Sequence, residues 1–223
     1  MDRKYIVVTL DGPSGSGKSS VARRLARGLN YRFLDTGAMY RTVALAALRA
    51  GVSFCPLDQK AIERLLDEVT IDLDNEGCAL LDGERVGDAI RDEAVTRVVS
   101  EVSALKSVRE RMVALQRSFA ARGDLVAEGR DMGSVVFPDA RHRFFLDADP
   151  AERARRRAAQ ISRKGRPVPD EEAITAAMKE RDSKDRSRNL APLSIAAGME
   201  VIDTTGMTLD EVVATLLEKI RSS

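Results

Sequence analysis

The stretch that decides the fold reads Gly-Pro-Ser-Gly-Ser-Gly-Lys-Ser and runs from Gly12 to Ser19. It matches the pattern G-x-x-x-x-G-K-[ST], in which a glycine-rich loop wraps the phosphates of a nucleotide. The apolar run 6–10 before it predicts a buried parallel strand, and the segment 20–26 after it predicts a helix. A plain Gly/Ser turn is the competing interpretation. The order strand, loop, helix favours a site for a nucleoside triphosphate.

The residue types in this loop suit phosphate chemistry. Glycines let the backbone approach the anion closely, and the N–H groups at the start of the following helix point at it. Lys18 would reach the β- and γ-phosphates of ATP, and the Ser19 hydroxyl would bind Mg²⁺, the expected cofactor. The predicted ATP-binding residues are Gly12, Pro13, Ser14, Gly15, Ser16, Gly17, Lys18, Ser19 and Ser20, joined by Arg157 from an arginine-rich helix.

Composition narrows the class of protein but does not indicate what kind of molecule it binds. The 223 residues suit one large domain or one domain with insertions, and the formal net charge of +1 favours no charged partner. No apolar run is long enough to cross a membrane, and residues 1–4 lead into the first strand rather than into a cleavable signal. Cys55 and Cys78 are isolated, which suits a reducing cytosol. We expect a cytoplasmic protein without a membrane partner.

Strands and helices alternate along most of the chain, which predicts an α/β fold with a parallel sheet flanked by helices. The expected strands after the first are 32–35, 125–128, 142–147 and 200–203. The expected helices include 38–50, 59–68, one from about Asp92, one with its buried face at Val108, Met112, Leu115 and Phe119, one opening at Pro150, and one with a capping box at Thr208 and Glu211.

A small antiparallel patch interrupts this alternation. Segments 70–73 and 78–81, joined by Asn75-Glu76-Gly77, predict a hairpin, and 84–87 follows it. We therefore expect a core at 1–56 and 108–223 and an inserted mixed subdomain at 57–107.

Two polar segments follow strands and should lie at the carboxyl edge of the sheet, where α/β proteins bind ligands. In the first, 35–41, Thr36 either caps the next helix or forms an anion site with Arg41. In the second, 128–133, Arg130 suits a phosphate and Asp131 suits an amine or hydroxyl donor, although a structural ion pair is the alternative.

Arginine is dense in the last third of the chain. Arg153, Arg155, Arg156 and Arg157 share one helix, and Arg181, Arg186 and Arg188 follow a break at 165–169 that includes Arg166. Solvated helix faces explain many such runs, but a helical lid at about 153–188 that closes over phosphates also fits. An RNA-binding patch is disfavoured by an aromatic content of 4% and by the interleaved acids, so no nucleic-acid partner is expected.

Several of these segments together resemble the bacterial cytidylate kinase family. They are Asp-Gly-Pro-Ser-Gly-Ser-Gly-Lys at 11–18, Asp-Thr-Gly-Ala-Met-Tyr-Arg at 35–41, Gly-Arg-Asp-Met-Gly at 129–133, Glu-Arg-Asp at 180–182 and Asn-Leu-Ala-Pro-Leu at 189–193. The resemblance covers essentially the whole chain, in order. It implies a P-loop NTPase core of the nucleoside monophosphate kinase type, with the insert binding the monophosphate and a short helical lid. It also implies a monomer that phosphorylates CMP or dCMP with ATP.

The resemblance also implies site residues. Those near the CMP phosphate are Thr36, Arg41, Arg130 and Arg188; those reading cytosine are Ser100, Arg109 and Asp131; those at the sugar are Arg181 and Asp185. Thr36 stands where the family often has Ser, and it keeps the hydroxyl. Ser100 and Arg109 lie outside the most specific segments. The expected catalytic residues are Lys18, Arg130 and Arg188.

The expected mechanism is direct in-line transfer to an acceptor phosphate that is already ionised, so no general base is needed. A kinase of another small acceptor, such as UMP, AMP, shikimate or gluconate, is an alternative on the same core. A P-loop regulatory switch or a nucleic-acid-stimulated ATPase is a further alternative from a different class. Two separate arginine-bearing anion sites favour a second phosphorylated ligand over a switch.

Overall fold

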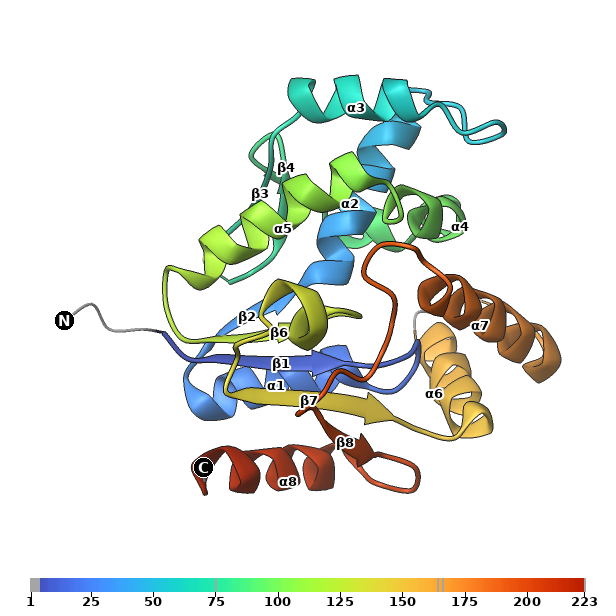
Figure 1. Cartoon of the computed structure of the whole chain (residues 1–223). Coiled ribbons are helices and arrows are strands. Elements are labelled where there is room, and N and C mark those ends of the chain that lie inside the picture. Colours follow the sequence, from blue (N-terminus) through green and yellow to red (C-terminus); the bar gives the residue numbers. More distant parts are fainter. Residues whose placement is uncertain (1–4, 75, 164, 166, 223) are drawn as a thin grey trace. The chain divides into compact units, whose positions relative to one another are not determined.

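The computed structural model describes residues 5–74, 76–163, 165 and 167–222 (Figure 1). The expectations for residues 1–4, Asn75 and Arg166 therefore lie outside the described residues. The chain divides into two compact units. The first contains Arg32–Asp124 together with Tyr5, and the second contains Ile6–Tyr31 and the chain from Leu125 onward.

The second unit is built on a parallel sheet with the strand order β6-β1-β7-β8. Its strands are β1 (Val7–Asp11), β6 (Leu125–Glu128), β7 (His142–Asp147) and β8 (Glu200–Asp203). Val8 of the central strand β1 pairs with Val126 on one side and His142 on the other. Val8 and Leu10 on one face of β1 and Thr9 on the other are all fully buried, so both faces of the strand are covered, as is usual in a parallel sheet. The predicted α/β class is confirmed.

Four helices and a short π-helical turn complete this unit. They are α1 (Lys18–Leu29), η2 (Met132–Val136), α6 (Pro150–Arg163), α7 (Glu171–Arg186) and α8 (Leu209–Arg221). Helix α1 packs on β1, β6 and α8. The predicted capping box of Thr208 and Glu211 opens α8. Helices α6 and α7 lie side by side (Figure 1), joined by a small apolar cluster of Ala154, Ile174 and Met178.

The first unit gathers its elements around one helix. Its elements are β2 (Arg32–Asp35), α2 (Thr36–Arg49), α3 (Gln59–Glu68), β3 (Ile71–Leu73), β4 (Ala79–Leu81), β5 (Glu84–Arg85), η1 (Gly87–Arg91), α4 (Glu93–Val102) and α5 (Lys106–Ala120). Strands β3, β4 and β5 form the predicted antiparallel patch. Helix α2 contacts α3, α4, α5 and this sheet, because its alanines let neighbours approach on several sides. The predicted insert 57–107 lies within this unit.

The structure removes one of the two interpretations of Thr36 and corrects one position on the predicted buried face of α5. The N-cap of α2 is Asp35, whose Oδ1 accepts a hydrogen bond from the Ala38 amide at 2.9 Å, and Thr36 is already the first helical residue. On α5, the fully buried position is Gln116, whereas Leu115 is only half-buried. Positions four apart stack along a helix, so Gln116 continues the line of Val108 and Met112 in spite of its polarity. Among the described residues, no helix has the length and the apolar run that crossing a bilayer requires.

Candidate active site

The phosphate loop joins the central strand β1 to helix α1 in the second unit. Gly12 has φ +144°, and a Cβ there would lie 2.0 Å from the Leu146 carbonyl oxygen on β7, so no other residue fits. Gly17 precedes α1 without a side-chain cap, and the first turn of α1 has no acidic residue. The first N–H groups of a helix have no partners within the helix and carry a partial positive charge. This end of α1 is therefore suited to an anion.

Lys18 lies folded back inside the loop. Its Nζ donates to the Pro13 carbonyl oxygen at 2.6 Å and to Ser16 Oγ at 3.3 Å, and the residue is only 5% exposed. Burial, aided by the charge of Arg130 and opposed by Glu128, lowers the pKa of Lys18 to about 7. Both hydrogen-bond partners are neutral oxygens, so the ammonium gains less compensation than an ion pair would give. A phosphate would supply the missing negative charge.

Ser19 and Glu128 form an oxygen-rich pair beside the loop. Ser19 Oγ donates to Glu128 Oε1 at 2.6 Å, and Glu128 is buried at the carboxyl end of β6. Hydroxyl and carboxylate oxygens are the hard ligands that Mg²⁺ prefers. These two residues therefore fit a magnesium site. Ser19 was predicted as the metal ligand, and Glu128 was not. Its position at the end of a strand next to β1 is the signal that could have identified it.

Asp11, the last residue of β1, holds the segment that follows β6. Its two carboxylate oxygens accept hydrogen bonds from the amides of Met132 at 2.9 Å and Gly133 at 2.7 Å. Burial raises the pKa of Asp11 to about 6, even though both amide bonds act in the opposite direction. Asp131, buried immediately before η2, is therefore anchored through its neighbours to the strand that carries the phosphate loop.

Arg130, Asp185 and Arg188 form one ion-pair cluster. Asp185 Oδ2 accepts from Arg130 Nε at 2.8 Å, and its Oδ1 accepts from Arg188 Nη2 at 2.5 Å. Burial would raise the pKa of Asp185, but the charges of Arg130, Arg188 and the nearby Arg181 together outweigh it and lower the pKa. Burial likewise disfavours the charged form of Arg130. The charge and the hydrogen bond of Asp185 have a larger effect in the opposite direction, so the pKa of Arg130 is raised. The cluster holds two positive charges and one negative charge.

The ion pair considered for Arg130 from the sequence is thus present, and its partner is Asp185. Arg130 also donates from Nη1 to the Gly129 carbonyl oxygen at 3.3 Å. A guanidinium has five N–H donors, more than these two bonds use. The ion pair therefore leaves Arg130 able to bind a phosphate.

The first unit carries the other predicted acceptor residues. Thr36 is buried at the start of α2. Arg41, on the same helix, donates from Nη1 to the Ile90 carbonyl oxygen at 3.0 Å and to Thr96 Oγ1 at 2.9 Å. Ser100 is half-buried on α4, one turn after Thr96. These contacts bring α2 and α4 together around polar side chains.

Arg109 lies on α5 of the same unit and is buried. Its guanidinium carbon is 5.7 Å from the centre of the Tyr40 ring, and its Nη1 donates to the Ser103 carbonyl oxygen at 3.5 Å. A guanidinium in contact with an aromatic face keeps N–H donors in its own plane. Those donors suit the N3 and O2 acceptors of a cytosine ring.

The arginines of α6 lie in different surroundings. Arg153 is buried against Asp182 of α7, whereas Arg155 is exposed and pairs with Glu152. Arg156 also pairs with Glu152 and donates from Nη2 to the Thr204 carbonyl oxygen at 2.7 Å. The predicted ATP contact Arg157 is exposed beside Gln160. Arg181, on α7, is half-buried.

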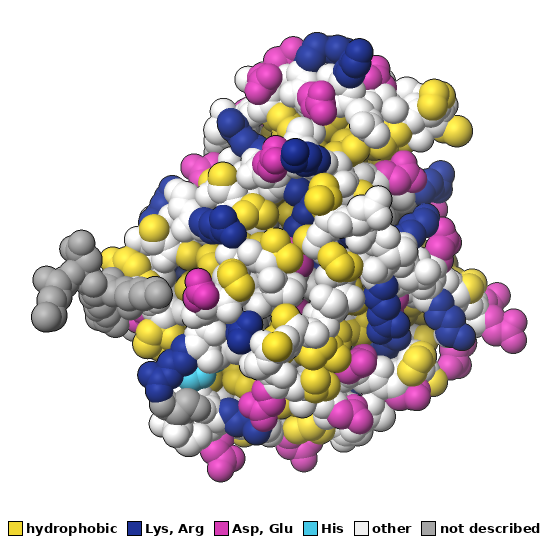
Figure 2. Space-filling view, viewed as in Figure 1, with side chains coloured by type: hydrophobic (Ala, Val, Ile, Leu, Met, Phe, Trp, Pro, Cys, Tyr) yellow, Lys and Arg dark blue, Asp and Glu magenta, His cyan; other side chains and the backbone are white. Residues whose placement is uncertain are grey.

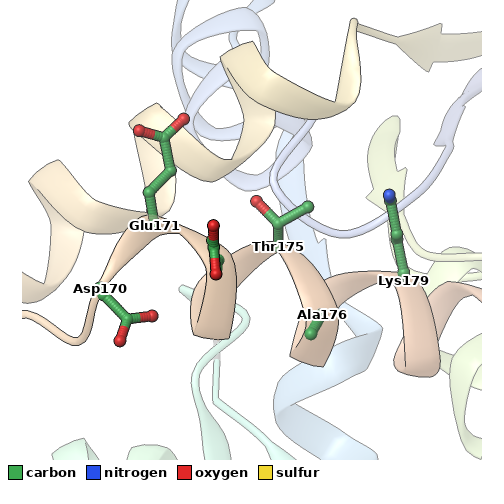
Figure 3. A pocket seen from close by; sticks show the side chains of 6 residues that line it. Asp170, Glu171, Thr175, Ala176 and Lys179 are labelled. Atoms are coloured by element: carbon green, nitrogen blue, oxygen red, sulfur yellow. The ribbon is translucent and has the colours of Figure 1, made fainter.

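The outer surface of α7 forms an open hollow of about 800 Å³ (Figure 3). The described residues that line it come from α7 and its N-cap, and they are Asp170, Glu171, Glu172, Thr175, Ala176 and Lys179. None of these six is a predicted site residue. On the face seen in Figure 2, basic and acidic side chains are interspersed, in keeping with the formal net charge of +1.

Comparison with known proteins identifies the family. The family model for cytidylate kinase matches residues 8–222. The cytidylate kinase of Chlorobaculum tepidum is 44% identical over 99% of this chain and 96% of its own length, and that of Mycobacterium leprae is 46% identical over 97% and 96%. An uncharacterized protein from Eubacterium ventriosum, of known crystal structure, is similar in fold, with a TM-score of 0.55 at 17% identity over 99% of this chain and 100% of its own. The predicted family is confirmed, and this chain belongs to the cytidylate kinase family.

Proposed function

We propose that this protein transfers the γ-phosphoryl group of ATP to CMP or dCMP by direct in-line transfer, giving CDP or dCDP. Membership of the cytidylate kinase family supports the reaction. The single observation that carries the acceptor half is the cluster of Arg130, Asp185 and Arg188, whose excess positive charge suits the phosphate of a nucleoside monophosphate.

On the donor side, the amides at the start of α1 and the Lys18 ammonium would hold the polyphosphate. Lys18 would exchange its bond to the Pro13 carbonyl oxygen for one to a phosphate oxygen. Ser19 and Glu128 would hold Mg²⁺, directly or through water. When bound, the cation neutralises charge on the donor phosphates. Arg157 is proposed as a further ATP contact.

On the acceptor side, we propose phosphate contacts for Thr36, Arg41, Arg130 and Arg188. Ser100, Arg109 and Asp131 are proposed to read the base, because cytosine offers an N4–H donor for a carboxylate or hydroxyl and acceptors for a guanidinium. Arg181 and Asp185 are proposed to serve the sugar. The pairing of Asp185 with two arginines adds a second role, which is to hold those guanidinium groups in place.

Catalysis in this proposal comes from positioning and charge. The acceptor oxygen is already ionised near neutral pH, so no side chain needs to remove a proton. Lys18, Arg130 and Arg188 would stabilise the charge on the phosphoryl group during transfer. Segment 57–107 is proposed to serve as the monophosphate-binding subdomain and about 153–188 as a lid that excludes water.

The same proposal takes the protein to be a cytoplasmic monomer that acts on small molecules without a nucleic-acid or membrane partner. The isolated cysteines and the balanced charge support it. Light scattering of the purified protein at several concentrations tests the monomer, and a mass of twice the chain would contradict it.

The decisive experiment follows a γ-labelled phosphate from Mg·ATP in the presence of CMP, dCMP, UMP, AMP, GMP or no acceptor. We expect label in CDP and dCDP, little in UDP, and almost no free phosphate without an acceptor. Label in ADP from AMP, or in GDP from GMP, would retain the fold and contradict the base-reading residues. Free phosphate released equally under all conditions would instead indicate a switch or an ATPase.

A further inference from the structure

Ser14, within the phosphate loop, has both of its backbone polar groups bound by side chains from α6 and α7. Its amide donates to Asp182 Oδ1 at 2.9 Å, and its carbonyl oxygen accepts from Arg153 Nη1 at 2.9 Å. The same Arg153 nitrogen pairs with Asp182 Oδ2 at 2.5 Å. The two side chains are only 8% and 6% exposed, so this is a buried ion pair that binds the backbone of the loop on both sides of the Ser14 Cα.

The next residue shows how closely the helices approach the loop. Gly15 has φ +78°, and a Cβ there would lie 2.6 Å from Met178 Cε of α7 and 3.1 Å from the Arg153 carbonyl oxygen of α6. Arg153 is also fixed at the base of α6, because its Nε donates to the Ala148 carbonyl oxygen at 3.2 Å. A shift of the loop would therefore displace the residues that it contacts on both α6 and α7.

Helix α7 continues this connection to the ion-pair cluster. Asp182 and Asp185 are three residues apart, so they lie on the same side of the helix, about 4.5 Å apart along its axis. Asp182 binds the phosphate loop, and Asp185 binds Arg130 and Arg188. One short rigid segment thus joins the loop assigned to ATP to the arginines assigned to the acceptor phosphate.

We propose that the Arg153–Asp182 pair is a positioning link between the two nucleotide sites. ATP in the loop would fix the Ser14 peptide, the pair would fix α7, and α7 would fix Arg130 and Arg188 for the acceptor. Neither residue is assigned a contact with a nucleotide, so both are positioning residues. The inference rests on the proposed function and adds to it a route by which each nucleotide strengthens the binding of the other.

The test removes the link while keeping the interior filled. The double variant Arg153→Met/Asp182→Leu replaces the buried ion pair with apolar side chains, a change that proteins often tolerate. It also removes both side-chain partners of the Ser14 backbone. The matched control is Arg155→Met, an Arg-to-Met change on the same helix at an exposed ion pair. Calorimetry measures the affinity for CMP with and without a non-hydrolysable ATP analogue, and initial rates give kcat.

We expect the ATP analogue to tighten CMP binding in the parent and in the control. In the double variant we expect this coupling to be lost and kcat to fall by on the order of a hundredfold, the effect of displacing reacting groups by about 1 Å. A double variant that keeps both the coupling and kcat of the parent would show that the pair only supports the fold. Absence of coupling in the parent would equally overturn the link.

Two milder variants cover the case in which the double variant does not fold. Asp182→Asn keeps an acceptor for the Ser14 amide but removes the charge, and we expect it to weaken the coupling. Arg153→Lys keeps the charge, and we expect it to retain part of the coupling. Unchanged coupling in Asp182→Asn would contradict the proposal.

A second readout separates failure of the link from failure of the proposed function. If the parent shows no CMP-dependent turnover, the proposed function fails. The link is then still tested by hydrogen exchange, in which the ATP analogue alone should slow exchange of the α7 amides in the parent and in Arg155→Met, and should slow it less in Asp182→Asn. Equal slowing in Asp182→Asn would overturn the link by itself.

Discussion

Lys18, which is buried, and Arg130, which is half-buried, are both cations assigned to phosphate, yet their surroundings are opposite. Lys18 donates to neutral oxygens, and its pKa is lowered to about 7 by burial. Arg130 is paired with Asp185, which raises its pKa against the effect of burial. The protonated form of Lys18 would therefore be stabilised by a bound anion, whereas the charge of Arg130 is already stabilised by Asp185 in the free protein. The donor and acceptor halves of the site thus prepare for phosphate in different ways.

Removing the donor cation should have the largest effect. We expect Lys18→Met to lower kcat by on the order of a thousandfold, because a charge aimed at the transferred phosphoryl group is lost from a water-excluded site. Steady-state rates with Mg·ATP and CMP measure it, and circular dichroism checks that the fold is intact. A folded variant with parent-like kcat would contradict the role of Lys18.

Breaking the prearranged cluster should affect stability first. Asp185→Asn leaves two arginines facing each other in a site where Asp185 is only 2% exposed, so we expect the free energy of unfolding to fall by about 3 kcal/mol at pH 7. The lowered pKa of Asp185 stabilises the fold above its ordinary value of 3.8, and this contribution is lost as the pH falls through the lowered pKa.

Urea unfolding of the parent and of Asp185→Asn at several pH values measures this difference. The deficit of the variant should narrow as the pH falls below 3.8. An unchanged midpoint at pH 7 would mean that the cluster is not balanced by Asp185.

A base-reading residue should affect only one nucleotide. We expect Asp131→Ala to weaken CMP binding by roughly tenfold to a hundredfold, since the N4–H donors of cytosine lose a charged acceptor, while the affinity for an ATP analogue stays within about twofold. Calorimetry with each nucleotide in turn measures both affinities. Equal losses for the two nucleotides would assign Asp131 a structural role at the start of η2.

The smallest expected effect concerns protons. With a pKa of about 7, Lys18 is mostly neutral at pH 8 in the free protein, and a bound triphosphate should recharge it. Binding of the ATP analogue at pH 8 should therefore take up about one proton, and the affinity should fall as the pH rises above 7. Calorimetry in two buffers of different ionisation enthalpy measures the uptake, with Lys18→Met as the control. Buffer-independent heats in the parent would mean that Lys18 is already charged.

The sequence was most informative where the signal is contiguous. Three features are specified by residues that are close together in the sequence: the phosphate loop, the strand at 142–147 and the capping box of α8. The structure has all three as predicted. The sequence left open whether Thr36 caps α2, because Asp35 and Thr36 are adjacent and both are good capping residues, and the structure has Asp35 as the cap.

Pairings between distant residues could not be predicted. Nothing near Arg153 distinguishes it from the exposed Arg155, yet Arg153 is buried because Asp182 meets it from α7. The same holds for Asp185, whose partner Arg130 lies on a different element. Long charged side chains are usually solvated, so their burial depends on partners that only the folded chain brings near.

The place of β1 in the sheet has a consequence for biosynthesis. Val7 pairs with Leu125 and Val8 with His142, so every strand partner of β1 is translated long after it. Residues 32–124, in contrast, form a compact unit that is continuous in the chain. Because contacts between distant residues form more slowly than local ones, we expect the nascent chain to complete that unit first. Limited proteolysis of stalled ribosome–nascent chain complexes tests this order. When residues 1–130 have left the ribosome, the unit 32–124 would already be folded. The phosphate loop after β1 would still be unfolded, because β7 has not yet been made available to pair with β1.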